Sequence, residues 1–152
     1  MTLTNQIRAA HIKLFYYITT FIYLSLTVLV VYLNPANMFL ILLGLLVTFV
    51  VLVALNLTRE YNFIIYKVTD DKIIIRYYPL HPFHDKFKSI EMSKKSFSHF
   101  ELEKCSLGLR ENLFLFQMSV KGLAKYPGIS LSALSKKQRQ EIIDSLSKFS
   151  KK

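Results

Sequence analysis

The sequence predicts a membrane protein: a transmembrane helical hairpin, then a small antiparallel β domain with a C-terminal α-helix. Three observations predict this fold. Two long apolar runs carry no charge, short β-branched and aromatic segments follow them, and the chain ends in an amphipathic pattern. The 95 residues of the segment 58–152 are enough for one small domain with a single core.

The two apolar runs cover residues 14–33 and 39–57, and neither contains Asp, Glu, Lys, Arg or His. About 20 apolar residues in a helix span a hydrocarbon core of roughly 30 Å. Because only residues 34–38 separate the runs, the two helices must be antiparallel neighbours. The first run is longer than the apolar part of a signal peptide and lacks a small-residue cleavage site. We therefore expect residues 14–57 to form a lasting transmembrane hairpin.

The positive charge flanks the outer ends of this hairpin. Arg8 and Lys13 lie before it, Arg59 and Lys67 follow it, and the link 34–38 has no Lys or Arg. Lys and Arg favour the cytoplasmic side of membrane helices. We therefore expect a multi-pass protein with both termini in the cytoplasm, residues 1–13 forming a cytoplasmic tail and residues 58–152 a cytoplasmic domain. The single cysteine of the chain suits a reducing compartment.

Each predicted helix has a face suited to helix–helix contact. On the first helix this face carries Tyr16, Thr20, Tyr23 and Thr27, and on the second Gly44 and Thr48. Polar-aromatic and small residues at this spacing favour close packing in lipid. The two faces could pack on each other, or one could contact a partner protein or a second copy of the chain. No ionisable residue lies at membrane depth, which argues against a transporter or channel.

The segment after the hairpin has the pattern of short strands and a final helix. We expect strands over residues 63–68, 72–78, 87–92, 97–104, 113–120 and about 129–131. Thr69-Asp70-Asp71 suits a turn between the first two strands. Ser135 and Gln138 match a capping box that begins a helix over about 136–149. Its apolar side chains, Ile142, Leu146 and Phe149, share one face and should cover the sheet.

Two segments, Tyr66–Arg76 and Ile129–Ser135, resemble those of small bacterial membrane proteins with two N-terminal transmembrane helices and a PH-like (pleckstrin-homology) domain. The resemblance implies a PH-like antiparallel β-barrel or sandwich capped by the C-terminal helix. It also implies the bacterial cytoplasmic (inner) membrane as location, and no enzyme activity. Phosphoinositide-binding PH domains carry several Lys and Arg in the first loop. Here that loop is the short, acidic Thr69-Asp70-Asp71, so this binding mode is not carried over.

Motifs for catalysis, cofactors or metals are weak in this chain. His81, His84 and Asp85 could be joined by His99 or Cys105, but a proline divides the cluster and the spacing matches no known metal site. There is no nucleophile elbow, phosphate-binding loop or dinucleotide fingerprint. We therefore expect no enzyme activity, no cofactor, no metal and no small-molecule substrate. No nucleic-acid-binding motif accompanies the basic charge.

Two functions remain. The first, which we prefer, is a membrane-anchored interaction or scaffold module, an accessory component that docks on a larger inner-membrane assembly through its PH-like domain and hairpin. The alternative is a module that binds or senses the anionic lipids of the cytoplasmic leaflet. The candidate lipid-facing residues are Arg8, Lys13, Arg59, Lys136, Lys137 and Arg139.

Overall fold

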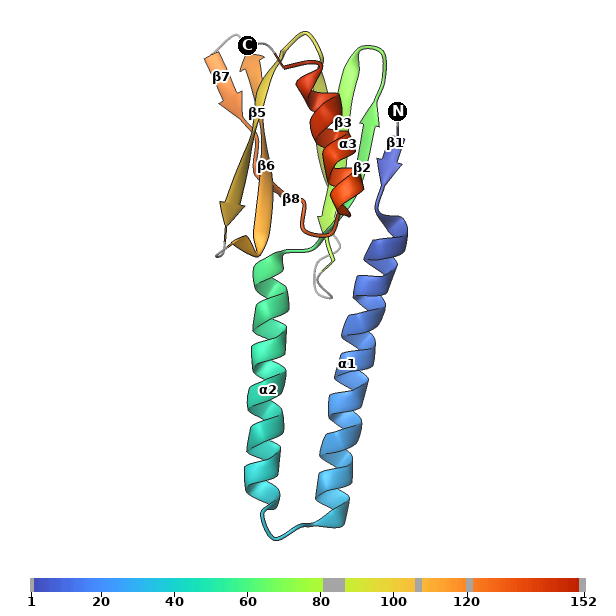
Figure 1. Cartoon of the computed structure of the whole chain (residues 1–152), viewed down its shortest axis with the longest axis vertical. Coiled ribbons are helices and arrows are strands. Elements are labelled where there is room, and N and C mark those ends of the chain that lie inside the picture. The colour runs from blue at the N-terminus through green and yellow to red at the C-terminus, as the bar shows by residue number, and fades with distance from the viewer. Residues whose placement is uncertain (1, 81–86, 106–107, 120–121, 151–152) are drawn as a thin grey trace.

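The computed structural model of the chain describes residues 2–80, 87–105, 108–119 and 122–150. A long helical hairpin extends from one end of a domain that contains two sheets (Figure 1). The hairpin consists of α1 (Gln6–Leu33) and α2 (Met38–Arg59). At 1.5 Å per residue the helices are about 42 Å and about 33 Å long. Both are long and apolar enough to cross a membrane. The prediction of two neighbouring antiparallel apolar helices is confirmed.

Both helices end at a residue in the left-handed conformation. Asn34 ends α1 with φ 43°, and its backbone N–H donates to the carbonyl of Val30. Asparagine tolerates this conformation well, and Pro35 then prevents the helix from continuing. Glu60 ends α2 with φ 42°, although its side chain has no such preference. Its carboxylate forms an ion pair with Arg110, which holds the residue in place.

The strands form two antiparallel sheets. The first sheet has the order β1-β2-β3-β4, built from β1 (Thr2–Thr4), β2 (Asn62–Val68), β3 (Lys72–Pro79) and β4 (Lys88–Ser93). The second contains β5 (Phe97–Cys105), β6 (Arg110–Ser119), β7 (Gly122–Lys125) and β8 (Ile129–Ser130), with β6 pairing all three others. The predicted turn at residues 69–71 joins β2 to β3.

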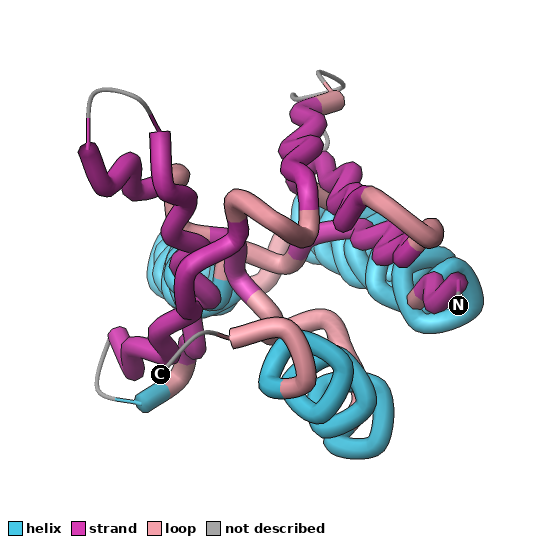
Figure 2. The backbone as a smooth tube through the Cα atoms, turned by 90° about the horizontal axis from the view of Figure 1, so that it is seen from above, coloured by secondary structure: helices cyan, strands magenta, loops and turns pink. Residues whose placement is uncertain are grey.

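The PH-like barrel implied by the resemblance does not close. Within the described ranges no strand of the first sheet pairs with a strand of the second, and Figure 2 shows two separate groups of strands. The edge of β2 that a closing strand would need is occupied by β1. Two strands, β1 and β7, were not predicted. β1 has only three residues, too few to establish a period, and all four residues of β7 are exposed, so β7 shows no hydrophobic alternation.

The core lies between the two sheets and α3 (Lys136–Ser147). Ser135 and Gln138 form the predicted capping box. The face of α3 that carries Ile142 and Leu146 is buried against the sheets, as predicted. The first sheet contributes Leu3, Ile64, Tyr66, Ile73, Ile75, Tyr77, Ile90 and Met92, and the rest of the domain contributes Phe97, Leu113, Leu115, Ile129, Leu131 and Leu134.

Inside this core the Tyr66 hydroxyl donates a hydrogen bond of 2.9 Å to the Ser145 hydroxyl. Burial raises the pKa of the Tyr66 phenol, and the bond to Ser145 lowers it in part. The phenol therefore stays protonated and keeps its donor role, which ties β2 to α3.

Asn5 joins the hairpin to the domain. It occupies the N-cap position of α1, yet its side chain makes no capping bond to its own helix. Instead its Oδ1 accepts from the N–H of Ile64 and its Nδ2 donates to the carbonyl of Asn62, both at 2.9 Å. Asn5 is 1% exposed, and Ala9 one turn later is also buried. Residues 2–13 of the expected tail are therefore part of the fold.

Replacing Asn5 by Ala should destabilise the protein by about 2–4 kcal/mol, because a donor on Ile64 and an acceptor on Asn62 would be buried without partners. Asn37→Ala is the matched control: Asn37 holds the N-cap position of α2, also without a side-chain capping bond. We expect that control to change stability by less than about 0.5 kcal/mol. The measurement is unfolding of the full chain in detergent micelles. Equal effects of the two substitutions would contradict the role of Asn5.

Candidate functional site

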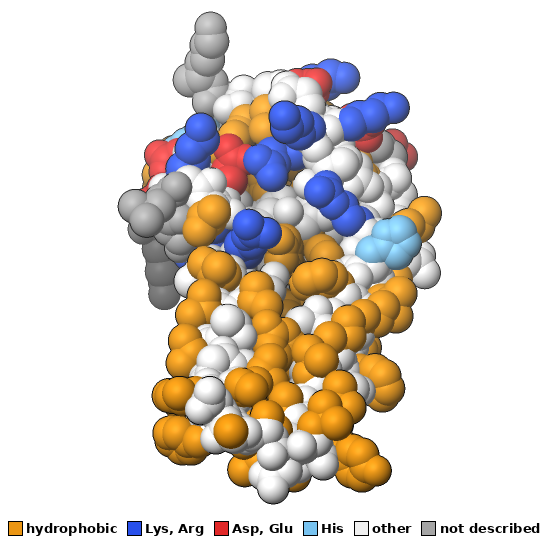
Figure 3. Space-filling view, turned by 60° about the horizontal axis from the view of Figure 1, so that its bottom comes forward, with side chains coloured by type: hydrophobic (Ala, Val, Ile, Leu, Met, Phe, Trp, Pro, Cys, Tyr) orange, Lys and Arg blue, Asp and Glu red, His pale blue; other side chains and the backbone are white. Residues whose placement is uncertain are grey.

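The polar-aromatic face of α1 lies along α2. Figure 3 shows the hairpin covered by hydrophobic side chains, with Lys and Arg at the domain end. A groove of about 380 Å³ runs between the helices. The rings of Tyr23 and Phe49 meet across it with their centroids 5.1 Å apart. The groove is lined by Thr20, Tyr23, Leu24, Thr27, Leu42, Leu45, Leu46 and Phe49.

Gly44 and Thr48 lie outside this contact. Both are exposed, and a Cβ atom added to Gly44 would meet no atom within 4 Å. The Thr48 hydroxyl donates back to the carbonyl of Gly44 at 2.9 Å, which satisfies it within its own helix. The two predicted faces therefore do not pack on each other. The face of Gly44 and Thr48 is open on the outside of α2.

Gly44→Leu should leave the stability of the hairpin unchanged or raise it by up to about 1 kcal/mol, because the added side chain meets open space and leucine favours a helix over glycine. Tyr23→Ala removes the ring contact with Phe49 and should destabilise the hairpin by about 1–3 kcal/mol. Unfolding in detergent measures both. A large loss of stability from Gly44→Leu would show that this face is packed.

The structure distributes the six candidate lipid-facing residues unevenly. Arg8, Lys136 and Lys137 are exposed in the first turns of α1 and α3. The Lys13 ammonium lies 5.3 Å from the centroid of the Tyr78 ring, in a cation–π arrangement. Arg59 and Arg139 are far apart in the sequence but line one pocket, where the end of α2 meets the start of α3.

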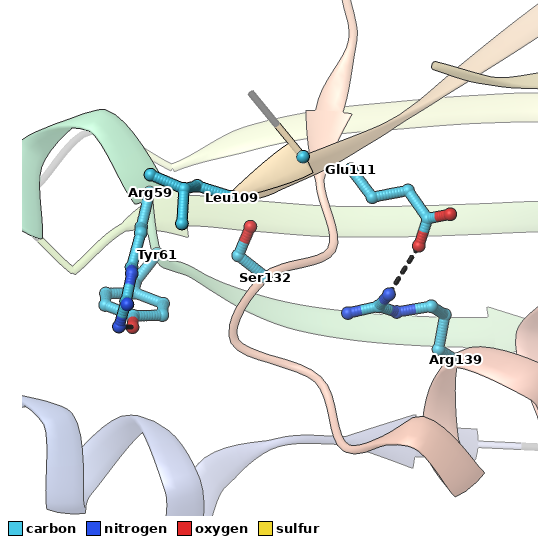
Figure 4. Close-up of a pocket in the computed structure, with 7 residues that line it drawn as sticks. Arg59, Tyr61, Leu109, Glu111, Ser132 and Arg139 are labelled. Atoms are coloured by element: carbon cyan, nitrogen blue, oxygen red, sulfur yellow. Dashed lines mark hydrogen bonds and ion pairs between the residues drawn. The ribbon is translucent and has the colours of Figure 1, made fainter. Parts of the chain in front are cut away.

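This junction pocket has a volume of about 300 Å³ and is lined by Arg59, Tyr61, Gly108, Leu109, Glu111, Ser132 and Arg139. Figure 4 shows Arg59 beside Tyr61 on one side, the Arg139–Glu111 ion pair on the other, and Ser132 between them. The Arg59 guanidinium donates to the Tyr61 hydroxyl at 3.0 Å. Among the described residues it is paired with no carboxylate. The lining thus has two guanidinium groups and one carboxylate.

Neighbouring contacts fix the walls of the junction pocket. The Ser130 hydroxyl donates to the carbonyl of Arg59 at 3.3 Å, which attaches the end of α2 to β8. Glu60 pairs with Arg110 of β6. Tyr16 of α1 lies close enough to Arg59 and Tyr61 to interact electrostatically with both. Glu111 of β6 was not predicted as part of this site, because no local sequence pattern links it to Arg59 of α2 or Arg139 of α3.

An aromatic cluster lies beside the junction. The ring of Tyr78 is 5.0 Å from that of Phe63 and 4.5 Å from that of Phe87 between centroids. Phe63 and Tyr78 pack on a small core of Ala9, Leu80 and Ala133, joined by Ile12 and Tyr61. Tyrosine rings, such as those of Tyr61 and Tyr78 in this cluster, are enriched at membrane–water interfaces. Sequence reasoning assigned these residues to strands only.

The outer face of the second sheet carries an exposed apolar pair. Met118 and Leu123 lie opposite each other in β6 and β7 and are 61% and 52% exposed. Next to them His99 stacks on Phe116, with ring centroids 4.3 Å apart and planes 9° apart. The Lys125 ammonium lies 4.1 Å from the centroid of the Phe114 ring. The exposed pair thus lies next to Phe114 and Phe116, whose rings are covered by Lys125 and His99.

The residue types considered for metal binding are not gathered in the structure. His81, His84 and Asp85 lie outside the described residues. In the part of the chain that the structure describes, no three His, Cys, Asp or Glu side chains form a group that could hold a metal ion. Cys105 is half-buried, and its Sγ accepts a hydrogen bond of 3.6 Å from the Asn112 amide.

Comparison of the chain with protein-family models, curated proteins and solved structures finds no match. The class of protein is therefore defined by its architecture. It is an apolar helical hairpin fused at both ends to a domain of two antiparallel sheets and one C-terminal helix.

Proposed function

We propose that this chain is a membrane-anchored, non-catalytic interaction module, an accessory component that docks on a larger assembly of the bacterial cytoplasmic membrane. One observation carries the proposal: a hairpin with a bare apolar surface is joined to the domain through both of its helices. Such a construction holds the domain at a set distance and orientation from the bilayer.

The burial pattern supports the membrane location. α2 has no buried residue and α1 buries only Ala9, so most apolar side chains of the hairpin are exposed in the described chain. Soluble proteins rarely expose an apolar surface of this extent. The distribution of Lys and Arg near the helix ends favours both termini, and hence the sheets, on the cytoplasmic side.

The attachment of the domain supports a scaffold role. The end of α2 continues into β2, and α1 is tied to the same strand by Asn5 and by β1. With two attachments the domain cannot swing freely about a single linker. Its outer surfaces therefore face fixed directions, as a docking module requires.

The exposed pair Met118 and Leu123 is the proposed docking surface on the domain. β7 is also exposed along its whole length at the edge of its sheet, where a strand of a partner could be added. Exposed apolar residues beside a free edge favour a protein partner. In the membrane, the open face of Gly44 and Thr48 offers a contact for a partner helix or a second copy.

The test is gentle detergent extraction of the tagged full-length chain. Wild type should yield a complex of constant composition, and Met118→Asp with Leu123→Asp should lower the recovery of its partner by about tenfold, because two carboxylates would be buried in an apolar contact. Thr2→Asp, on the exposed edge of the other sheet, should leave recovery unchanged. Recovery of wild type only as a bare monomer, where other membrane complexes survive, would contradict the proposal.

The alternative function, binding of anionic lipid, is supported by one specific observation. Arg59 and Arg139, both candidates from the sequence, line the same pocket. This pocket lies at the end of α2, where a membrane-spanning helix would leave the hydrocarbon.

A further inference from the structure

We propose that the junction pocket binds the phosphate group of a phospholipid, held by Arg59 with the hydroxyls of Tyr61 and Ser132 and with Arg139. The inference rests on the proposed membrane location of the hairpin. It adds to the alternative function a specific ligand group, a phosphodiester, and the residues that would bind it.

Charge favours a singly charged anion in this pocket. Its lining carries Arg59, Arg139 and Glu111, a net charge of +1, and the nearby pair of Arg110 and Glu60 adds none. A phosphodiester carries one negative charge. A carboxylate partner already holds Arg139, whereas the Arg59 guanidinium donates only to the neutral Tyr61 hydroxyl among the described residues. Arg59 is therefore the residue with charge left to neutralise.

The donor groups match phosphate chemistry. A guanidinium presents several N–H groups in a planar fork that fits phosphate oxygens, and hydroxyls of Tyr and Ser add further donors. The Arg139 guanidinium also donates to the carbonyl of Leu131 at 3.5 Å, so it is more fully paired than that of Arg59. The pocket lining is mostly polar, apart from Leu109 and the ring of Tyr61.

Position selects a lipid as the source of the phosphate. Arg59 is the last residue of α2 and follows an apolar run that ends at Leu57. The headgroup region begins where the hydrocarbon core ends. A lipid packed against the exposed face of α2 would place its phosphate at the level of the pocket. The Ser130 bond to the carbonyl of Arg59 keeps this end of the helix against the domain.

The experiment measures lipid binding to the full-length chain in non-ionic detergent by native mass spectrometry. Four conditions are compared: phosphatidylglycerol alone, diacylglycerol alone, phosphatidylglycerol with inorganic phosphate, and phosphatidylglycerol at high salt. Wild type should bind one phosphatidylglycerol, and affinity should fall at high salt because the contact is partly exposed. Diacylglycerol, which lacks the phosphate, should not bind. Inorganic phosphate at the same concentration should not displace the lipid. Displacement of the lipid by equimolar phosphate would overturn the choice of a lipid ligand.

Arg59→Gln should weaken phosphatidylglycerol binding by about tenfold, the effect of losing one charged hydrogen-bond donor. The matched control is Lys72→Gln, which removes one positive charge at the exposed start of β3, at the far end of the domain (Figure 1). It should bind as wild type does. Tyr61→Phe keeps the ring in its apolar cluster and removes only the hydroxyl, so it should weaken binding by about threefold. Unchanged phosphatidylglycerol binding in Arg59→Gln would overturn the site.

Failure of this site is distinguishable from failure of the membrane proposal. If Arg59→Gln binds the lipid normally while the chain still requires detergent, the anchor stands and the pocket proposal is wrong. If wild type is soluble without detergent, both the membrane anchor and the lipid-binding pocket are wrong. Arg59→Lys tests geometry: it keeps the charge but loses the planar fork, so its affinity should lie between those of wild type and Arg59→Gln.

Discussion

Two helices whose long uncharged apolar runs the described chain leaves exposed impose the main constraint on this structure. The hairpin contributes no side chain beyond Ala9 and its neighbours near the junction to the packed interior, and the domain has its own complete core. The apolar surface of the helices is therefore exposed in the described chain, and this exposure is the basis of the proposed membrane location. Every property proposed for the domain, from its orientation to its lipid contact, depends on that arrangement.

The second constraint is the junction between the hairpin and the domain, where polar contacts join the two parts. Asn5 uses both atoms of its amide on β2, Ser130 attaches the end of α2 to β8, and Glu60 pairs with Arg110. Buried polar groups are costly without partners, so these bonds select one orientation of the hairpin on the domain. The same contacts shape the pocket around Arg59. The contacts that hold the hairpin on the domain therefore also form the candidate ligand site.

The strongly periodic features could be predicted from the sequence. The uncharged runs, the turn at Thr69-Asp70-Asp71 and the capping box at Ser135 depend on local chemistry, and each lies where expected. The strand Thr2–Thr4 could not be predicted, since three residues carry no period and its stability comes from pairing with β2, about sixty residues away. The barrel implied by the resemblance was wrong because this unpredicted strand occupies the edge of β2 that barrel closure would need. The junction pocket joins four separate stretches of the chain, 59–61, 108–111, 132 and 139, so only Arg59 and Arg139 could be proposed beforehand, and on charge alone.

The measurement that tests the central claim most directly is labelling from the two sides of the membrane. With Cys105 replaced by Ser, one variant carries Ala36→Cys in the link between the helices, and another carries Thr69→Cys at the β2–β3 turn. We predict that a membrane-impermeant maleimide added to intact cells whose outer surface is accessible labels Ala36→Cys and leaves Thr69→Cys unlabelled until the cells are opened. Labelling of both positions only after lysis, or of both before it, would contradict a hairpin that crosses the bilayer and returns.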